Sequence, residues 1–271
     1  MSGLKVLIRG GGDLGSGVGV RLFRAGAEVI FVELPTPLVV RRFVSFAEAI
    51  ISGSTMVEEV PAQKASSEEE VYALLKKRIV PVLVDPQAEA IRWFQPDVLV
   101  DARLKKAPPE IGLEAASLVI GLGPGFTVGV NCHAVVETKR GPTLGRVYWN
   151  GTAEADSGLP EGVNGFVEER VLRAPQNGSF KPFVRICDFV NKGQPVAEVN
   201  GMTILAQFDG VVRGLVMEGL LVTKGMKVGD IDPRKDPRLC SLVSDKSLAV
   251  GGGALEAVLS IPALRRKLCG Y

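Results

Sequence analysis

Three glycines near the N-terminus have the spacing of a phosphate-binding turn. Gly10, Gly12 and Gly15 fit the pattern G-x-G-x-x-G, between an apolar run at 4–8 and an amphipathic run at 18–25. This order predicts a strand, a tight turn and a helix, with a backbone that a pyrophosphate can approach closely. The helix would also direct N–H groups and the positive end of its dipole at that point. The stretch favours binding of a nucleotide or another phosphate-bearing ligand, and a sharp turn without a ligand is the alternative.

Acidic residues accompany this glycine turn. Glu33 ends the next predicted strand, 29–32, at about the distance where a ribose-binding acid is expected, and an acid there favours NAD over NADP. Asp13 lies inside the turn, where it would repel a bare phosphate unless it caps the helix or binds a cation. We therefore take Gly11, Asp13 and Glu33 as cofactor-binding candidates together with the three glycines.

A pair of arginines follows the second predicted strand. The apolar spacing over 38–51 predicts a helix, and Arg41 and Arg42 lie near its start. Positive charge at a helix N-terminus opposes the dipole, so these side chains need an offset. Water or the acids Glu33 and Glu48 could supply it, and so could an anionic ligand at the end of the sheet. Arg41 is therefore a further cofactor-binding candidate.

Loops after later strands carry more candidates. Asp101 ends a predicted strand and is followed by basic residues, beginning with Arg103. A second glycine turn, with Gly123 and Gly125, follows the predicted strand 118–122. Ligands of open parallel sheets lie outside the carboxyl ends of the strands, where two such turns can face each other. We add Gly123 and Gly125 to the cofactor-binding candidates.

Cys132 and His133 are the catalytic candidates. His133 is the only histidine in the chain, and it lies beside a thiol between two glycine turns. Cys132 could act as a nucleophile beside a base, and a thiol can also carry sulfur or selenium as a persulfide or selenosulfide. Neighbouring residues on a regular strand point to opposite faces, which disfavours a direct dyad of the two. A structural histidine remains the alternative.

Composition excludes several classes of protein. The net charge of +2 gives no electrostatic case for binding nucleic acid or a membrane surface. No apolar run approaches the roughly 20 residues of a membrane span, and the N-terminus lacks the pattern of a signal peptide. The cysteines contain no C-x-x-C pair, so we expect no zinc or iron–sulfur site and no other metal. Reduced thiols in the cytoplasm are the simplest interpretation.

Three regions are predicted from the order of the elements. Helices and strands alternate over 1–150, which indicates a Rossmann-like parallel-sheet domain that binds a nucleotide or phosphate. Short strands and repeated turns over 151–240 indicate an all-β domain. A helix within 241–271 is expected to return to the first domain. The fold class is therefore α/β, with a Rossmann-like domain followed by a barrel-sandwich domain.

The all-β region is similar to the flattened barrel of biotinyl and lipoyl domains. Those domains carry their cofactor on a lysine at a hairpin tip, and the matching hairpin here, 199–202, has no lysine. We therefore expect neither biotin nor lipoate, and a docking or structural role for this domain.

Four motifs together resemble the YqeB-type family, whose members are accessory proteins of selenium-dependent molybdenum hydroxylases. The motifs are IRGGGDL at 8–14, VSFAEA at 44–49, GLGPGF at 121–126 with VVET at 135–138, and GDIDPR at 229–234. The first domain is also similar to the nucleotide-binding half of accessory proteins that load xanthine dehydrogenase. One departure concerns the turn after Thr138, where relatives are expected to read Arg-Gly-His and this chain has Pro142 in place of the histidine.

The resemblance implies a cytoplasmic accessory factor that matures a molybdenum hydroxylase and handles selenium, sulfur or the pterin cofactor. The partners would be the hydroxylase or its maturation machinery and a small phosphate-bearing ligand, either NAD(P) or another nucleotide, or molybdopterin. An NAD(P)-dependent oxidoreductase and a non-enzymatic scaffold that docks the hydroxylase are the alternatives. The ligand's identity, any catalysed reaction and the oligomeric state stay open.

Overall fold

A computed structural model describes all residues except 1–2, 106–108, 156–168 and 271. The chain divides into two compact units. The first comprises Met1–Pro37, Ser45–Asp156 and Val243–Tyr271, and the second comprises Leu38–Val44 and Ser157–Leu242. The short segment Leu38–Val44 thus belongs to the second unit, although both of its neighbours in sequence belong to the first.

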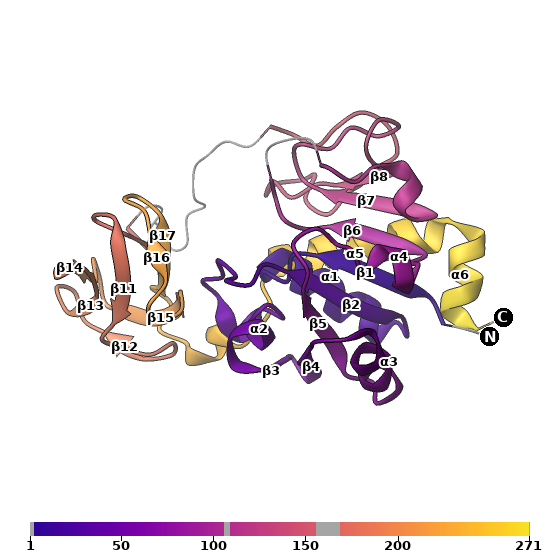
Figure 1. Ribbon diagram of the computed structural model, residues 1–271. Helices are drawn as coiled ribbons and strands as arrows, with labels where there is room; N and C mark the ends of the chain where they lie inside the picture. The colour runs from indigo at the N-terminus through magenta and orange to yellow at the C-terminus, as the bar shows by residue number, and fades with distance from the viewer. Residues whose placement is uncertain (1–2, 106–108, 156–168, 271) are drawn as a thin grey trace. The chain divides into compact units, whose positions relative to one another are not determined.

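One mixed nine-stranded sheet forms the centre of the first unit, in the order β3-β4-β5-β2-β1-β6-β7-β8-β9 (Figure 1). The strands are β1 Lys5–Arg9, β2 Glu28–Glu33, β3 Ser54–Val57, β4 Val60–Ala65, β5 Val80–Val84, β6 Val98–Asp101, β7 Leu118–Leu122, β8 Ala134–Val136 and β9 Val147–Tyr148. The inner strands from β4 to β8 pair in parallel, and the edge strands β3 and β9 are antiparallel. Central strands such as β7 are fully buried, which explains their continuous apolar sequences.

Helices α1 to α6 all lie in the first unit. They are α1 Asp13–Arg24, α2 Glu48–Ser52, α3 Glu68–Lys76, α4 Ile91–Phe94, α5 Asp245–Ser260 and α6 Pro262–Cys269, with the 3-10 helix η2 Leu113–Ala115. α5 crosses α1 so closely that a Cβ on Gly251 would lie 2.5 Å from the Gly17 carbonyl oxygen. A Cβ on Gly253 would likewise clash with the Gly145 carbonyl oxygen, whereas one on Gly252 would meet nothing within 4 Å. Packing therefore requires two of the three glycines that weaken α5 as an isolated helix.

No helix among the described residues has by itself the length and apolar composition of a membrane span. Only α5 and α6 taken together reach both, and the pair bends by 105° at its break.

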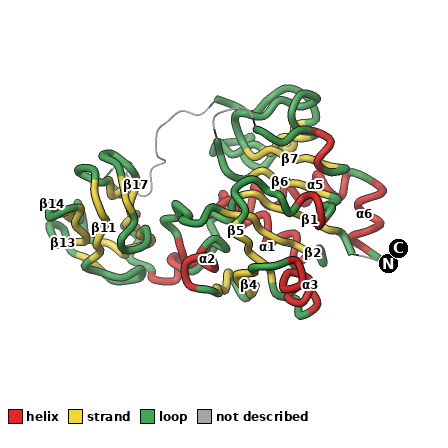
Figure 2. Tube along the Cα trace, viewed as in Figure 1, coloured by secondary structure: helices red, strands yellow, loops and turns green. Residues whose placement is uncertain are grey.

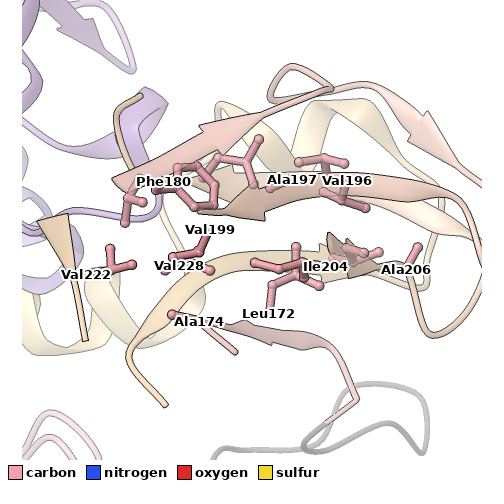
Figure 3. Packing of buried hydrophobic residues seen from close by; sticks show 14 of the residues in the cluster. Leu172, Ala174, Phe180, Val196, Ala197, Val199, Ile204, Ala206, Val222 and Val228 are labelled. Atoms are coloured by element: carbon pink, nitrogen blue, oxygen red, sulfur yellow. The ribbon is translucent and has the colours of Figure 1, made fainter. Parts of the chain in front are cut away.

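The second unit contains two four-stranded antiparallel sheets, β10-β17-β15-β12 and β14-β13-β11-β16. The strands are β10 Val171–Arg173, β11 Gly178–Pro182, β12 Phe189–Val190, β13 Pro195–Val199, β14 Met202–Leu205, β15 Gly210–Leu215, β16 Leu221–Val222 and β17 Lys227–Asp232, with the 3-10 helices η1 Arg42–Val44 and η3 Pro237–Cys240. The described residues of the unit are otherwise strand and loop (Figure 2). Side chains from both sheets meet in its core, among them Leu172, Phe180, Val199 and Val228 (Figure 3).

The predicted fold class is wrong. The large sheet is mixed rather than parallel, and the all-β part consists of two separate antiparallel sheets rather than a barrel-sandwich of the biotinyl type. The sequence pattern does not reveal the antiparallel direction of the two edge strands, which are short: β9 has two residues and β3 has four. Short strands of this kind leave little periodicity to read.

The helix predicted over 38–51 is also wrong. Residues 38–41 are irregular, and only η1 and the five-residue α2 are helical in this stretch. Val40 packs within the second unit, where its carbonyl lies so close to Gly214 that a Cβ there would be 2.6 Å away. The packing of Val40 against Gly214 has therefore overridden the helical preference that the apolar spacing of 38–51 predicted.

Candidate anion-binding site

The turns after β1, β6 and β7 lie at one edge of the sheet, because these three strands are parallel neighbours. β1 is the point where the strand order reverses: β2 and β5 continue to one side, and β6 and β7 to the other. Ligands of open parallel sheets bind beyond the carboxyl ends at such a point. The first glycine turn, the end of β6 at Asp101 and the second glycine turn therefore border the same region.

The first glycine turn packs tightly on the end of β6. Gly10 has a φ of +96°, and a Cβ there would lie 3.3 Å from the backbone of Ala102 and Arg103. A Cβ on Gly15 would clash with the carbonyl oxygen of Gly10. Gly12 precedes α1 as its N-cap residue. Packing alone thus accounts for Gly10 and Gly15, which is the ligand-free interpretation of the motif.

Glu33 holds the glycine turn through its side chain. Its Oε1 accepts a hydrogen bond from the Gly11 N–H at 2.6 Å, and its Oε2 accepts one from the Leu34 N–H at 2.8 Å. Burial raises the pKa of Glu33, and these two bonds oppose the shift. One N–H that would face a pyrophosphate is therefore bound by a carboxylate of the chain itself, so the ribose-binding role expected for Glu33 has no support in this geometry.

Asp13 connects two helices. Its Oδ1 accepts a hydrogen bond at 3.0 Å from Ser247 Oγ, in the first turn of α5. With Glu33, it brings negative charge to the N-terminus of α1, which stabilises the helix and disfavours a second anion at that point. The attraction for an anion must come from neighbouring side chains.

A charged cluster, here named the edge cluster, lies beside the glycine turn and consists of Arg9, Asp101, Arg103, Lys105 and Glu110. Arg9 ends β1 and is only 3% exposed. Its Nη1 is 3.5 Å from Asp101 Oδ2 and 3.5 Å from Glu110 Oε2. This placement follows from the sheet, since register pairs Arg9 with Asp101 on adjacent parallel strands.

Arg103 and Lys105 complete the edge cluster. Arg103 donates from Nε to Asp101 Oδ1 at 2.9 Å and from Nη2 to Asp101 Oδ2 at 2.5 Å. Its Nη2 also lies 2.9 Å from Glu110 Oε2, and Lys105 Nζ lies 2.9 Å from Glu110 Oε1. Glu110 thus bridges all three cations of the cluster, and its side chain is 56% exposed.

The electrostatics of the edge cluster suit an anionic ligand. Three cations face two carboxylates, which leaves one net positive charge. Burial and then the charge of Arg103 lower the pKa of Arg9, whereas Asp101 and Glu110 raise it. Hydrogen bonds from Lys105 and Arg103 hold the pKa of Glu110 far below its usual range. The Nη1 of Arg9 has no hydrogen-bond partner among the described residues, and an anion that displaces the exposed Glu110 would supply one.

The second glycine turn is also shaped by packing. A Cβ on Gly121 would enter the ring of Phe126, and one on Gly123 would clash with Thr138 Oγ1. Gly123 and Gly125 have φ values of +72° and +101°, which favour glycine. This turn follows β7, two strands from the glycine turn of β1, with the Asp101 end of β6 between them.

Cys132 and His133 lie near the N-terminal ends of the parallel strands, at the opposite end from the glycine turns. They precede β8, and the register of Ala134 with Ile120 puts His133 about four residues, roughly 13 Å along the strands, before the level of Gly123. Cys132 is fully buried in the core, and burial raises its pKa to about 11. His133 Nδ1 accepts a hydrogen bond from the Val119 N–H at 2.9 Å. The thiol is protonated and covered, so the expected nucleophile and chalcogen carrier at Cys132 is disfavoured.

Arg41 and the first glycine turn belong to different units of the chain. It belongs to the second unit, where its Nη2 donates to the carbonyl oxygens of Leu239 and Leu242 at 3.2 Å and 2.8 Å. No three described His, Cys, Asp or Glu side chains gather as a metal site would require. Of the residues that the sequence proposed, the geometry therefore groups Gly10, Gly11 and Glu33, and adds Arg9, Arg103 and Glu110 beside them.

The comparisons with known proteins give one close relative in sequence. No family model matches the chain. A protein of Escherichia coli (strain K12), "Uncharacterized protein YqeB", is 42% identical over 256 residues, which cover 94% of this chain and 47% of that protein. The chain resembles YqeB. It spans about half the length of YqeB, and the expected resemblance to YqeB-type proteins is thereby confirmed, without bearing on selenium or molybdenum.

Solved structures give only remote similarity. An aspartoacylase family protein from Mesorhizobium loti is 12% identical with a TM-score of 0.25, over 74% of this chain and 56% of that one. The apo structure of the Ectoine utilization protein EutE (DoeB) from Ruegeria pomeroyi is also 12% identical with a TM-score of 0.25, over 85% and 86% of the two chains. A TM-score of 0.25 is too low to establish a common fold or site.

Proposed function

We propose that the first unit binds a small phosphate-bearing ligand, a nucleotide or the phosphate of a molybdopterin-type cofactor, at the edge cluster. The observation that carries the proposal is Arg9: a buried guanidinium at the strand-order reversal whose Nη1 is held, among the described residues, only by two carboxylate oxygens at 3.5 Å, longer than an ordinary charge-assisted hydrogen bond. Phosphate oxygens are strong acceptors for guanidinium groups and can bind them in a bidentate manner. Arg103 lies beside Arg9 and would bind a second phosphate oxygen.

Glu110 is the residue that the ligand would displace from the edge cluster. It is the most exposed acid of the edge cluster, and it occupies the position between Arg9 and Arg103 that an anionic ligand would take. When Glu110 moves into water, its charge is solvated again and the ligand replaces its contacts with Arg9 and Arg103, whereas Asp101 stays paired with Arg103. Binding is thus an exchange of one anion for another, which selects ligands whose charge exceeds that of a single carboxylate.

For the protein as a whole, we propose a cytoplasmic accessory role in the maturation of a selenium-dependent molybdenum hydroxylase, with that hydroxylase or its maturation machinery as partner. Support comes from the four sequence motifs by which the chain resembles YqeB-type accessory proteins, together with a cluster suited to a phosphate-bearing cargo. The residues described above bind and orient; no bond is made or broken at the edge cluster in this proposal.

The binding proposal is tested by calorimetry with ATP, CTP, NAD, NADP and inorganic pyrophosphate. We expect at least one of them to bind, and Arg103→Gln to weaken that binding about tenfold or more, because a charge-assisted hydrogen bond is lost. The matched control is Arg92→Gln, since Arg92 is an exposed arginine of the same unit paired with Glu89. Equal affinities for both variants, or binding of none of the ligands, would refute the proposal.

The accessory role is tested separately. A tagged chain is co-expressed with a selenium-dependent molybdenum hydroxylase, and hydroxylase activity is compared between the wild type and Arg103→Gln. Higher activity with the wild type than with the variant supports the role, and equal activity with and without the chain contradicts it.

A further inference from the structure

Two cysteines of the second unit meet although they are far apart in sequence. The Cys187 N–H donates a hydrogen bond to the Val212 carbonyl oxygen at 2.8 Å, and Cys240 Sγ donates to the same oxygen at 3.6 Å. Cys187 Sγ in turn donates at 3.8 Å to the carbonyl oxygen of Pro237, the first residue of the helix η3 that ends at Cys240. The turn at Cys187 and helix η3 thus converge on one point of β15.

The Cys187 side chain also affects the pKa of Cys240. Burial, then a hydrogen bond with the Cys187 side chain and its charge, raise the pKa of Cys240 to about 12. Cys240 is fully buried, whereas Cys187 is partly exposed. A small molecule can therefore reach Cys187 first, and Cys240 keeps its proton as the second thiol of the pair.

The backbone at Cys187 is held in an unusual conformation. Its φ is +80°, in a region that residues other than glycine rarely adopt. The turn is fixed by Asp188, whose Oδ2 accepts from the Arg185 N–H at 2.7 Å and whose N–H donates to the Arg185 carbonyl oxygen at 3.1 Å. A glycine would fit here without strain, so the chain keeps a thiol at a position that disfavours one, as functional sites often do.

Two buried arginines lie beside the thiol pair. Arg41 Nη2 and Arg213 Nε both donate to the carbonyl oxygen of Leu239, at 3.2 Å and 3.3 Å, immediately before Cys240. Their positive charges lower the pKa of Cys240 against the larger effect of burial. Neighbouring guanidinium groups stabilise a thiolate, which is the reactive form of cysteine.

We propose that Cys187 and Cys240 form a redox-active dithiol whose substrate class is low-molecular-weight disulfides, with oxidised glutathione as the representative. Cys187, as a thiolate, attacks one sulfur of the disulfide; a new S–S bond forms, the old one breaks, and one glutathione leaves and takes up the proton. Cys240 then loses its proton and attacks the Cys187 sulfur, which expels the second glutathione as a thiol. Two protein thiols are oxidised to one disulfide, and one small disulfide is reduced to two thiols.

The proposal is tested with the full chain incubated in oxidised glutathione, alkylated and analysed by mass spectrometry after digestion. We expect a peptide pair joined by a Cys187–Cys240 disulfide and no lasting glutathione on Cys187. In Cys240→Ser the reaction should stop at a glutathione adduct on Cys187, and Cys187→Ser should leave Cys240 unmodified. Cys269→Ser is the matched control, because Cys269 is an exposed cysteine of the first unit and its loss should leave the joined pair unchanged.

Two results would overturn the proposal. One is a wild-type chain in which the adduct persists on Cys187 as it does in Cys240→Ser, because the second thiol then does not resolve it. The other is the absence of both adduct and disulfide while Cys269 is modified, because the oxidant is then active and the pair inert. Circular dichroism of the serine variants confirms that they are folded. The edge cluster is not part of this chemistry, so its ligand binding can fail without affecting the result.

Discussion

The same three-residue pairing occurs at the edge cluster and in the second unit. Asp101 binds Arg103 two residues on through both carboxylate oxygens, and Asp232 binds Arg234 in the same way. A second buried arginine lies 3.5 Å from each acid: Arg9 beside Asp101 and Arg213 beside Asp232. Only the edge cluster adds an exposed carboxylate, Glu110, between its two arginines.

That difference separates a structural ion pair from a candidate ligand site. In the second unit both acids are buried. Asp232 pairs with Arg234 and Arg213, and Arg213 also lies 4.0 Å from the buried Asp230. No acid there can leave without exposing an unpaired charge. At the edge cluster the exposed acid can leave, so the arginines can accept a different anion. Burial of the acid, rather than the presence of paired arginines, decides between structure and binding.

The largest effect is expected for Asp232→Ala. The substitution removes one partner of a buried pair and leaves Arg213 facing less negative charge, which costs about 3 kcal/mol in the free energy of unfolding. Urea unfolding of the full chain measures it. Asp236→Ala is the matched control, since Asp236 makes the same bonds to Arg238, which is 82% exposed; its loss should be much smaller. Equal losses would show that burial does not distinguish the pairs.

Acid should remove the contribution of Asp232. Burial raises the pKa of this carboxyl, but hydrogen bonds and charge from Arg234, with Arg213, outweigh burial and leave it below the usual value. A depressed pKa gives stability above the unfolded value of about 3.9, and the gain is lost as pH falls through the folded value. The stability difference between wild type and Asp232→Ala should therefore be constant above about pH 5 and shrink as the pH falls below about 3.9. A pH-independent difference would contradict the assignment.

The strands and turns that could be predicted are those that depend on residues close together in the sequence. The central strands could be predicted because they are buried on both faces and read as apolar runs, as β1 and β7 do. The glycine turns were also visible as turns. Their purpose was not, because the atoms that crowd Gly10 and Gly123 come from Ala102 and Thr138, which only the folded sheet brings near.

The edge cluster and the dithiol show what a sequence hides. The pairing of Asp101 with Arg103 is local and follows from their spacing, but Arg9 joins it only through the register of β1 with β6. Cys187 and Cys240 meet only because a turn and helix η3 converge on β15. Neither contact leaves a periodic signal in the sequence. The catalytic prediction was therefore made for Cys132, because it lies beside the only histidine of the sequence.

Arg9→Met should separate stability from binding at the edge cluster. Methionine keeps much of the buried volume, and Asp101 retains both bonds to Arg103, so we expect a loss of only about 1–2 kcal/mol in the free energy of unfolding. Binding of the phosphate-bearing ligand should fall about tenfold or more. Arg92→Met is the control for both measurements. A loss of stability as large as that of Asp232→Ala would place Arg9 in a closed structural pair and weaken the contrast.

Glu110→Gln should have the smallest effect on stability and the most informative sign. Removing an exposed charge leaves the free energy of unfolding nearly unchanged, but it removes the carboxylate that competes with the ligand for Arg9 and Arg103. Calorimetry should show ligand binding that is about three- to tenfold tighter. Glu114→Gln removes the same charge from a nearby exposed residue, so it controls for the general electrostatic gain. If both variants bind equally tightly, Glu110 does not occupy the ligand's position, and the edge cluster becomes a closed ion network like that at Asp232.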